Sequence, residues 1–158
     1  MTVDANAFRS ALGRFASGVT VVTTCDAGGS DHGMTASAFC SVSLDPPLIL
    51  VCVEKIANMH DPITSCTHFA VNVLAHDQEQ LARRFAETEG DRFDGIGFTR
   101  GAHGTPILDD GLAALECRRT ATYDGGDHTI IVGEVESAVW RDDRPLLYYR
   151  GGYAGIER

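Results

Sequence analysis

Short runs of β-branched, aliphatic and aromatic residues recur along the chain and constrain its fold more than any other feature. They occupy residues 19–25, 48–53, 69–74, 112–123, 128–141 and 146–150. Such side chains fit the pleated surface of a sheet, so the runs predict strands. Asp124-Gly125-Gly126-Asp127 separates the two longest runs and indicates a hairpin. We therefore expect a mainly β chain with a few short helices, in which six or seven strands form a closed antiparallel barrel.

Two segments refine this expectation. The run at 48–53 is apolar throughout, which predicts a fully buried strand. The segment from Phe8 to Phe15 has apolar residues at helical spacing, with Asp4 or Asn6 as candidate cap and Gly18 as the expected end of the helix.

Three further stretches are less regular. Residues 58–66 are expected to form at most a helical turn, because Pro62 interrupts them. Asp77 is expected to cap a helix over residues 78–87. Residues 88–111 are rich in glycine and are expected to form a long surface loop.

Length and charge limit the classes of function. A chain of 158 residues is expected to form a single domain, residues 1–158. With 13 basic and 22 acidic residues its net charge is -9, which argues against a nucleic-acid partner. No apolar run approaches the roughly 18 residues of a membrane span, and the first residues lack a signal-peptide pattern. We therefore expect a cytoplasmic protein that binds neither nucleic acid nor membranes.

The cysteines and histidines are scattered. The five cysteines form no C-x-x-C pair, and we expect most of them to be buried thiols in a reducing compartment. The six histidines show no H-x-x-x-H or H-E-x-x-H spacing. The sequence therefore predicts no metal site.

The stretch from Gly33 to Pro47 carries the most functional information. Its hydroxyl residues Thr35, Ser37, Ser41 and Ser43 stand at odd positions, so on one extended strand they would share a face. Hydroxyl and amide groups can hold an anion without a fixed charge. An ordinary half-buried strand rich in serine and threonine would show the same pattern.

The amino-acid sequence of this stretch resembles that of a known family. Thr-Ala-Ser-Ala-Phe-x-Ser-Val-Ser-x-Asp-Pro-Pro-Leu, at residues 35–48, is similar to the flavin-binding signature of the short-chain flavin reductases. These are the small reductase components of two-component flavin-dependent monooxygenases. The resemblance covers nearly the whole chain, from Phe8 to Tyr153. It implies an FMN-binding split β-barrel that pairs as a homodimer.

The resemblance also implies an activity, that of an NAD(P)H:flavin oxidoreductase. Hydride would pass from NADH or NADPH to FMN or FAD, and the reduced flavin would serve a partner monooxygenase. The chain has no G-x-G-x-x-G after a strand, so the nicotinamide cofactor is not expected to bind through a Rossmann unit. An arginine-rich site for the 2′-phosphate of NADPH is not evident, which favours NADH.

Two segments carry the flavin-binding residues that the resemblance implies. They are Met34, Thr35, Ala36, Ser37, Ser41, Val42 and Ser43, followed by Cys52, Val53, Glu54, Lys55, Asn58, Met59 and His60. Lys55 takes the family's basic position, where an ammonium could meet a phosphate, although it could equally be a solvated surface lysine. His60 matches the family histidine. Ala57 and Met59 replace hydroxyl residues of the family, so phosphate contacts there would be lost or made by backbone amides.

Four more residues enter by the same resemblance. Phe85 would lie near the flavin, although its spacing in a helix equally fits core packing. Arg92 would contact a phosphate or the nicotinamide, or be an ordinary surface arginine. His128, beside Asp127, would position the nicotinamide, and it is our candidate catalytic residue. Tyr148 would lie at the edge of the flavin.

Two other classes of function remain open. The first is a flavin- or haem-binding module of the same barrel that acts as a carrier or sensor without turnover. The second is a related split-barrel oxidase that acts on a small organic substrate. A sensor would keep its flavin through purification, and an oxidase would need its organic substrate for turnover.

Overall fold

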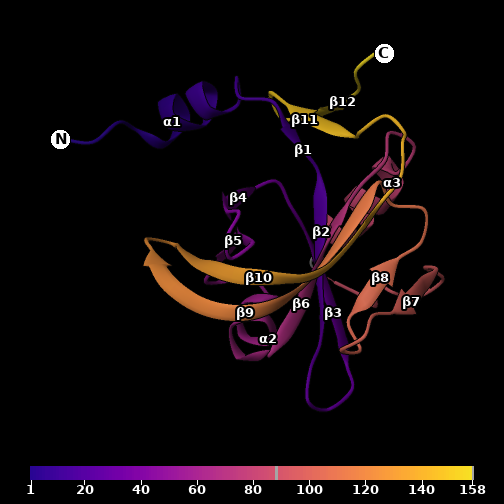
Figure 1. The fold of residues 1–158 in the computed structure, drawn as a ribbon. Coiled ribbons are helices and arrows are strands. Elements are labelled where there is room, and N and C mark those ends of the chain that lie inside the picture. Colours follow the sequence, from indigo (N-terminus) through magenta and orange to yellow (C-terminus); the bar gives the residue numbers. More distant parts are fainter. Residues whose placement is uncertain (88, 158) are drawn as a thin grey trace.

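The computed structural model describes residues 1–87 and 89–157 and is mainly β (Figure 1). The strands of its main sheet are β2 (Thr20–Cys25), β3 (Asp31–Ala36), β4 (Phe39–Ser43), β5 (Leu48–Glu54), β6 (His68–Val73), β9 (Ala113–Gly125) and β10 (His128–Trp140). They are antiparallel neighbours in the order β3-β2-β6-β9-β10-β5-β4. The expectation of a mainly β chain with a few short helices is confirmed.

The order of the strands makes this sheet curl into a barrel. β3 and β4 are its two edge strands, yet only residues 37–38 separate them along the chain. Three steps from Ala36 to Phe39 span at most about 11 Å, so the end of one edge strand must lie near the start of the other. The barrel is therefore open along the line where β3 meets β4.

The hairpin of β9 and β10 is the longest element and was predicted from its turn residues. Each strand has 13 residues, and Gly126 in the turn has φ 76°, a value that favours glycine. Register shifts after Val132 and after Val135 mark bulges, which increase the local twist. Figure 1 shows the two strands curving together around one side of the barrel.

Two apolar clusters hold the fold together. The larger fills the barrel and contains Val51, Val53, Phe69 and Ile131, all fully buried. The prediction that the whole run 48–53 is buried is wrong. Burial alternates along β5, because one face of the strand lines the core while the other faces outward.

The helices are α1 (Ala5–Leu12), α2 (His60–Ser65) and α3 (Glu79–Ala86). Asp4 caps α1, since its Oδ1 accepts from the Ala7 amide at 2.9 Å. The prediction that this helix runs to Gly18 is wrong, because Gly18 lies in the two-residue strand β1 (Ser17–Gly18). α2 tolerates Pro62 because a proline in the first turn removes no helical hydrogen bond.

Asp77 does not cap α3. Gln78 precedes the helix, and its side chain makes no capping hydrogen bond. Its Oε1 instead accepts from the Ala75 amide at 2.9 Å, and its Nε2 donates to the Asp109 carbonyl at 3.0 Å. The Gln78 side chain thus links two loops instead of capping α3.

The expected long loop is partly ordered into a hairpin. β7 (Phe98–Arg100) and β8 (Pro106–Leu108) pair with each other beside the main sheet. A third sheet, also small, joins β1 to β11 (Leu147–Tyr149) and β11 to β12 (Gly152–Ala154). Cys66 and Cys117 are the two buried cysteines among five, so the expectation that most are buried is wrong.

Candidate functional site

The link between β3 and β4 is the most open part of the predicted flavin-binding segment. Each of these strands has one neighbour in the main sheet, so the outward backbone groups of both have no strand partner among the described residues. Ser37, Ser41 and Val42 are exposed. The edge therefore offers hydroxyls and backbone groups to a ligand.

The hydroxyls of this segment do not share one continuous face. The extended chain breaks at residues 37–38, and a register shift follows between Ser41 and Ser43. Thr35 Oγ1 donates to the Ala82 carbonyl of α3 at 2.6 Å, so this hydroxyl fixes the helix to the sheet. Met34 packs against the barrel core, and Ala36 is buried.

The residues that follow β5 meet the tip of the β9–β10 hairpin. The Lys55 amide donates to the Asp127 carbonyl at 2.9 Å, and Lys55 Nζ is ion-paired with Asp124. The bond and charge of Lys55 lower the pKa of the Asp124 carboxyl. Both side chains are well exposed, and ion pairs of this kind are weak because water screens them. The ammonium can therefore exchange this carboxylate for a phosphate at little cost.

The two predicted histidines lie on the same end of the barrel. His60 Nε2 is 2.8 Å from Thr129 Oγ1, which joins α2 to β10. His128 Nδ1 is 2.6 Å from Asp127 Oδ1, and this hydrogen bond lowers the pKa of the Asp127 carboxyl. About a third of the His128 side chain is exposed. Because Asp127 holds one ring nitrogen, the other is directed to a fixed place.

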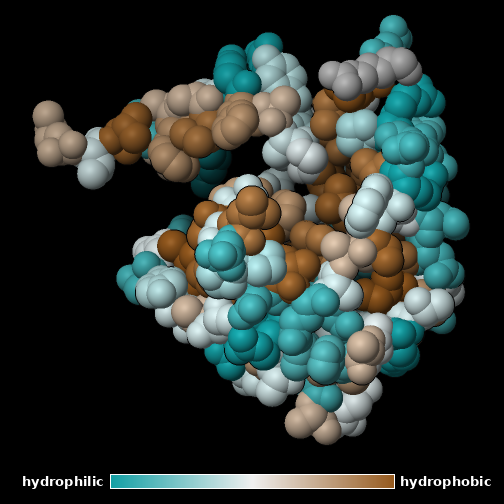
Figure 2. Space-filling view, viewed as in Figure 1, coloured by the Kyte–Doolittle hydropathy of each residue, from teal (hydrophilic) through white to brown (hydrophobic). Residues whose placement is uncertain are grey.

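Tyr148 lines an open hollow that borders the β3–β4 link. Its ring meets the Tyr153 ring edge-on, with centroids 5.3 Å apart. The hollow, of about 390 Å³, also includes Ser37, Phe15 and Arg150. Figure 2 shows it between α1 and the body of the protein, with apolar residues on both sides.

Arg92 and Phe85 both contact Gly33 of β3. Arg92 Nη1 donates to the Gly33 carbonyl at 2.6 Å. This bond ties the segment between α3 and β7 to β3. Phe85 is fully buried against Gly33 and meets the Phe93 ring edge-on at 5.0 Å. The core-packing interpretation of Phe85 is the one its surroundings favour. Arg92 still borders a cavity of about 220 Å³ that Asn58 also lines.

The predicted residues thus fall into an accessible and a buried group. Val53 and Met59 have buried side chains, so only their backbones can reach a ligand. Cys52 is half-buried and Glu54 is exposed. The Cys52 amide donates to the Ala38 carbonyl at 3.0 Å, and Glu54 faces His128 in the ladder of β5 and β10. The positions of β5 that face the β3–β4 link and His128 are therefore two residues, or roughly 7 Å, apart along the strand, and β5 itself lies between the link and His128.

Three contributors were not predicted as site residues. Asp124 and Thr129 hold Lys55 and His60, and Arg150 lines the hollow beside Tyr148. Asp124 stood in a predicted turn, and Arg150 ended the predicted strand at residues 146–150. Nothing in the local sequence signals the contacts of Asp124 and Thr129, because Lys55 and His60 are far away along the chain.

Comparison with known proteins identifies the family. A family model described as "Flavin reductase like domain" matches residues 12–157. The chain belongs to this family. The sequence resemblance is thereby confirmed.

Individual relatives agree with this assignment. The chain is 44% identical to "FMN reductase (NADH) SmoA" of Agrobacterium fabrum, over 98% of this chain and 88% of that protein. It is 42% identical to "Flavin-dependent monooxygenase, reductase subunit HsaB" of Rhodococcus jostii, over 98% of this chain and 80% of that one.

A solved structure gives the same result. The NADH:FAD oxidoreductase SgcE6 of Streptomyces globisporus, in complex with NAD and FAD fragments, matches with a TM-score of 0.92 and 40% identity. The match covers 99% of this chain and 97% of that one. Among the described residues of this chain, no helix has the length and apolar character needed to span a membrane.

Proposed function

We propose that this protein is an NADH-dependent flavin reductase that supplies reduced flavin to a partner monooxygenase. The observation that carries the proposal is the meeting of three segments at one end of the barrel. These are the β3–β4 link, the residues after β5, and His128 at the start of β10. SmoA and HsaB, at more than 40% identity, are named for this activity and for service to a monooxygenase.

The residues present fit a flavin. The exposed hydroxyls of Ser37 and Ser41, with the unpaired backbone edge, suit the polar groups of its side chain. Lys55 supplies a positive charge for a phosphate in a chain whose net charge is -9. Tyr148 supplies an aromatic wall in the hollow.

When bound, the flavin would accept hydride from NADH. This transfer requires no acid or base from the protein. The role of the protein is therefore to orient the flavin and the nicotinamide and to exclude water. His128, held through Nδ1 by Asp127, would direct Nε2 toward the nicotinamide. His60, held by Thr129, would position the segment between β5 and α2.

NADH oxidation by purified protein, with and without added FMN or FAD, tests the proposal. We expect turnover only with flavin, and a loss of about 10- to 100-fold in His128→Ala, since misplacement of a reactant has effects of this size. His76→Ala is the matched control, because His76 Nε2 also pairs with an aspartate, Asp143, at 3.2 Å. Absence of flavin-dependent turnover despite a bound yellow chromophore would favour the carrier or sensor.

We also propose that the protein acts as a homodimer. α1 buries none of its residues within the chain, and Phe8, Leu12 and Phe15 are 54%, 52% and 81% exposed. Figure 1 shows α1 standing away from the barrel. A helix of eight residues is unstable in water by itself, so this apolar face needs a cover. A second copy of the chain would supply it.

Light scattering tests this pairing. We expect twice the chain mass for the native protein and a monomer for Leu12→Asp, which places a charge on the apolar face. Arg14→Gln changes the net charge by the same single unit but leaves the apolar face intact, so it controls for charge. A monomeric native protein would contradict the proposal.

We also propose that this protein works in the cytoplasm, because a reducing compartment suits its five free cysteines.

A further inference from the structure

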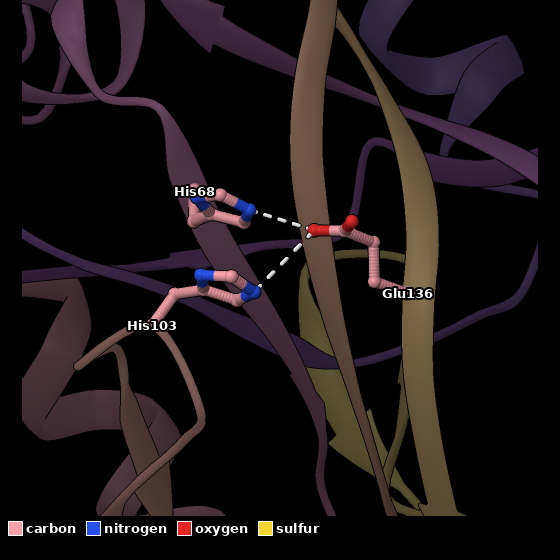
Figure 3. A group of neighbouring side chains, drawn as sticks. All are labelled: His68, His103 and Glu136. Atoms are coloured by element: carbon pink, nitrogen blue, oxygen red, sulfur yellow. Dashed lines mark hydrogen bonds and ion pairs between the residues drawn. The ribbon is translucent and has the colours of Figure 1, made fainter.

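Three side chains from separate elements converge on the outer face of the main sheet (Figure 3). His68 begins β6, His103 lies in the turn between β7 and β8, and Glu136 lies in a bulge of β10. His68 Nε2 is 2.6 Å from Glu136 Oε1, and His103 Nε2 is 3.7 Å from the same oxygen. All three ligand atoms lie within 4.8 Å of one another.

The turn that carries His103 is fixed by a carboxylate beneath it. Glu116 of β9 is 3% exposed. It accepts from the amides of Ala102 and His103 at 3.0 and 3.3 Å, and from the Thr105 hydroxyl. Buried hydrogen bonds to a charged group are strong, so the turn is held in place. His103 therefore stays near His68 without any ligand between them.

The two imidazole rings are stacked, with centroids 3.6 Å apart and planes 4° from parallel. Neutral imidazole is the form that binds metals. His68 Nδ1 lies 3.2 Å from Thr67 Oγ1, so the proton of a metal-bound ring has an acceptor there.

We propose that His68, His103 and Glu136 form a binding site for a divalent transition-metal ion such as Zn²⁺. Two histidine nitrogens and a carboxylate oxygen are ligands that this ion accepts, with water in the fourth position. Ligands about 2.0–2.1 Å from a tetrahedral ion lie about 3.4 Å apart, between the two distances observed here. The rings must tilt toward the ion, and His103, with its side chain 43% exposed, has room to do so.

The ion would join the β7–β8 turn to β6 and β10. Glu136 and His128 both lie on β10, eight positions apart, which corresponds to about 26 Å along a strand. The metal would therefore not contact His128. Its effect would be on the stability of the segment between α3 and β9, and this inference does not depend on the proposed reductase activity.

Calorimetric titration of tag-free protein with ZnCl₂ at pH 7.5 tests the site. We expect one Zn²⁺ per chain, binding at least about tenfold weaker in His103→Ala and in Glu136→Gln, and a higher unfolding temperature with the ion. Co²⁺ should give the visible absorption of a tetrahedral complex. Binding should weaken in acid, because protons compete with the metal ion for its ligand atoms.

Controls separate this site from other zinc ligands. His76→Ala removes a histidine elsewhere and should leave the titration unchanged, and Cys40→Ser removes the exposed thiol. The proposal is overturned if no binding is measured. It is equally overturned if His103→Ala binds like the native protein, or if only Cys40→Ser abolishes binding.

Discussion

The contact between Gly33 and Phe85 gives a sharp test of how α3 is held against β3. A Cβ atom added at Gly33 would lie 2.7 Å from Phe85 Cε1, closer than real Cβ contacts allow. Phe85 is fully buried and meets Phe93 on its other side, so its ring has little room to withdraw. Forcing extra atoms into such a core costs about 1–3 kcal/mol.

We therefore expect Gly33→Ala to be destabilised by ~2 kcal/mol, which lowers the melting temperature of a chain of this length by about 4–8 °C. Gly18→Ala is the control, because nothing lies within 4 Å of a Cβ there. Thermal and urea unfolding measure both variants.

A double-mutant cycle decides whether the ring is the cause. Phe85→Ala removes both ring atoms that the new methyl group would strike, so Gly33→Ala/Phe85→Ala should be less destabilised than the sum of the single variants by ~1 kcal/mol or more. Additive effects, or a Gly33→Ala variant as stable as Gly18→Ala, would refute this reasoning.

Three other outcomes are expected. Asp4→Ala removes the cap on the Ala7 amide and should weaken α1 by ~1 kcal/mol, measured as a loss of helical circular dichroism; unchanged helicity would contradict it. Arg150 has φ 51°, so Arg150→Gly should stabilise the protein by ~1 kcal/mol in urea unfolding, and a destabilised variant would show that its side chain matters more. Burial raises the pKa of the Cys117 thiol to about 12, so iodoacetamide at pH 8 should label exposed Cys40 and spare Cys117 in the folded protein, as mass spectrometry can test.

The strands were predictable because their signals are local. The β9–β10 hairpin follows from Asp124-Gly125-Gly126-Asp127 between two β-rich runs, and β2 follows from its β-branched residues. Ends of helices were less predictable. α1 stops six residues before Gly18 because the chain there joins β11 through β1, a contact that spacing cannot reveal.

The site was predictable as segments but not as contacts. The resemblance pointed to residues 34–43 and 52–60 as well as to His128. Of these, the β3–β4 link, the residues after β5 and His128 lie near one end of the barrel, whereas Ser43 pairs with Leu48 at the other end of β5. The resemblance could not show that Thr35 bonds to α3 or that Lys55 pairs with Asp124. The cluster of His68, His103 and Glu136 was missed altogether, because its members come from three elements and follow no spacing rule.

The pairing of the main sheet also has a consequence for the order of folding. β9 and β10 are consecutive and meet through a tight turn, so their hairpin closes a short loop and can form early. β5 must then find β10 across nearly half of the chain, and only that step brings β4 round to β3. Distant pairings of this kind make folding slow. The opening at the β3–β4 link, where the flavin is proposed to bind, would thus be the last part of the barrel to take shape.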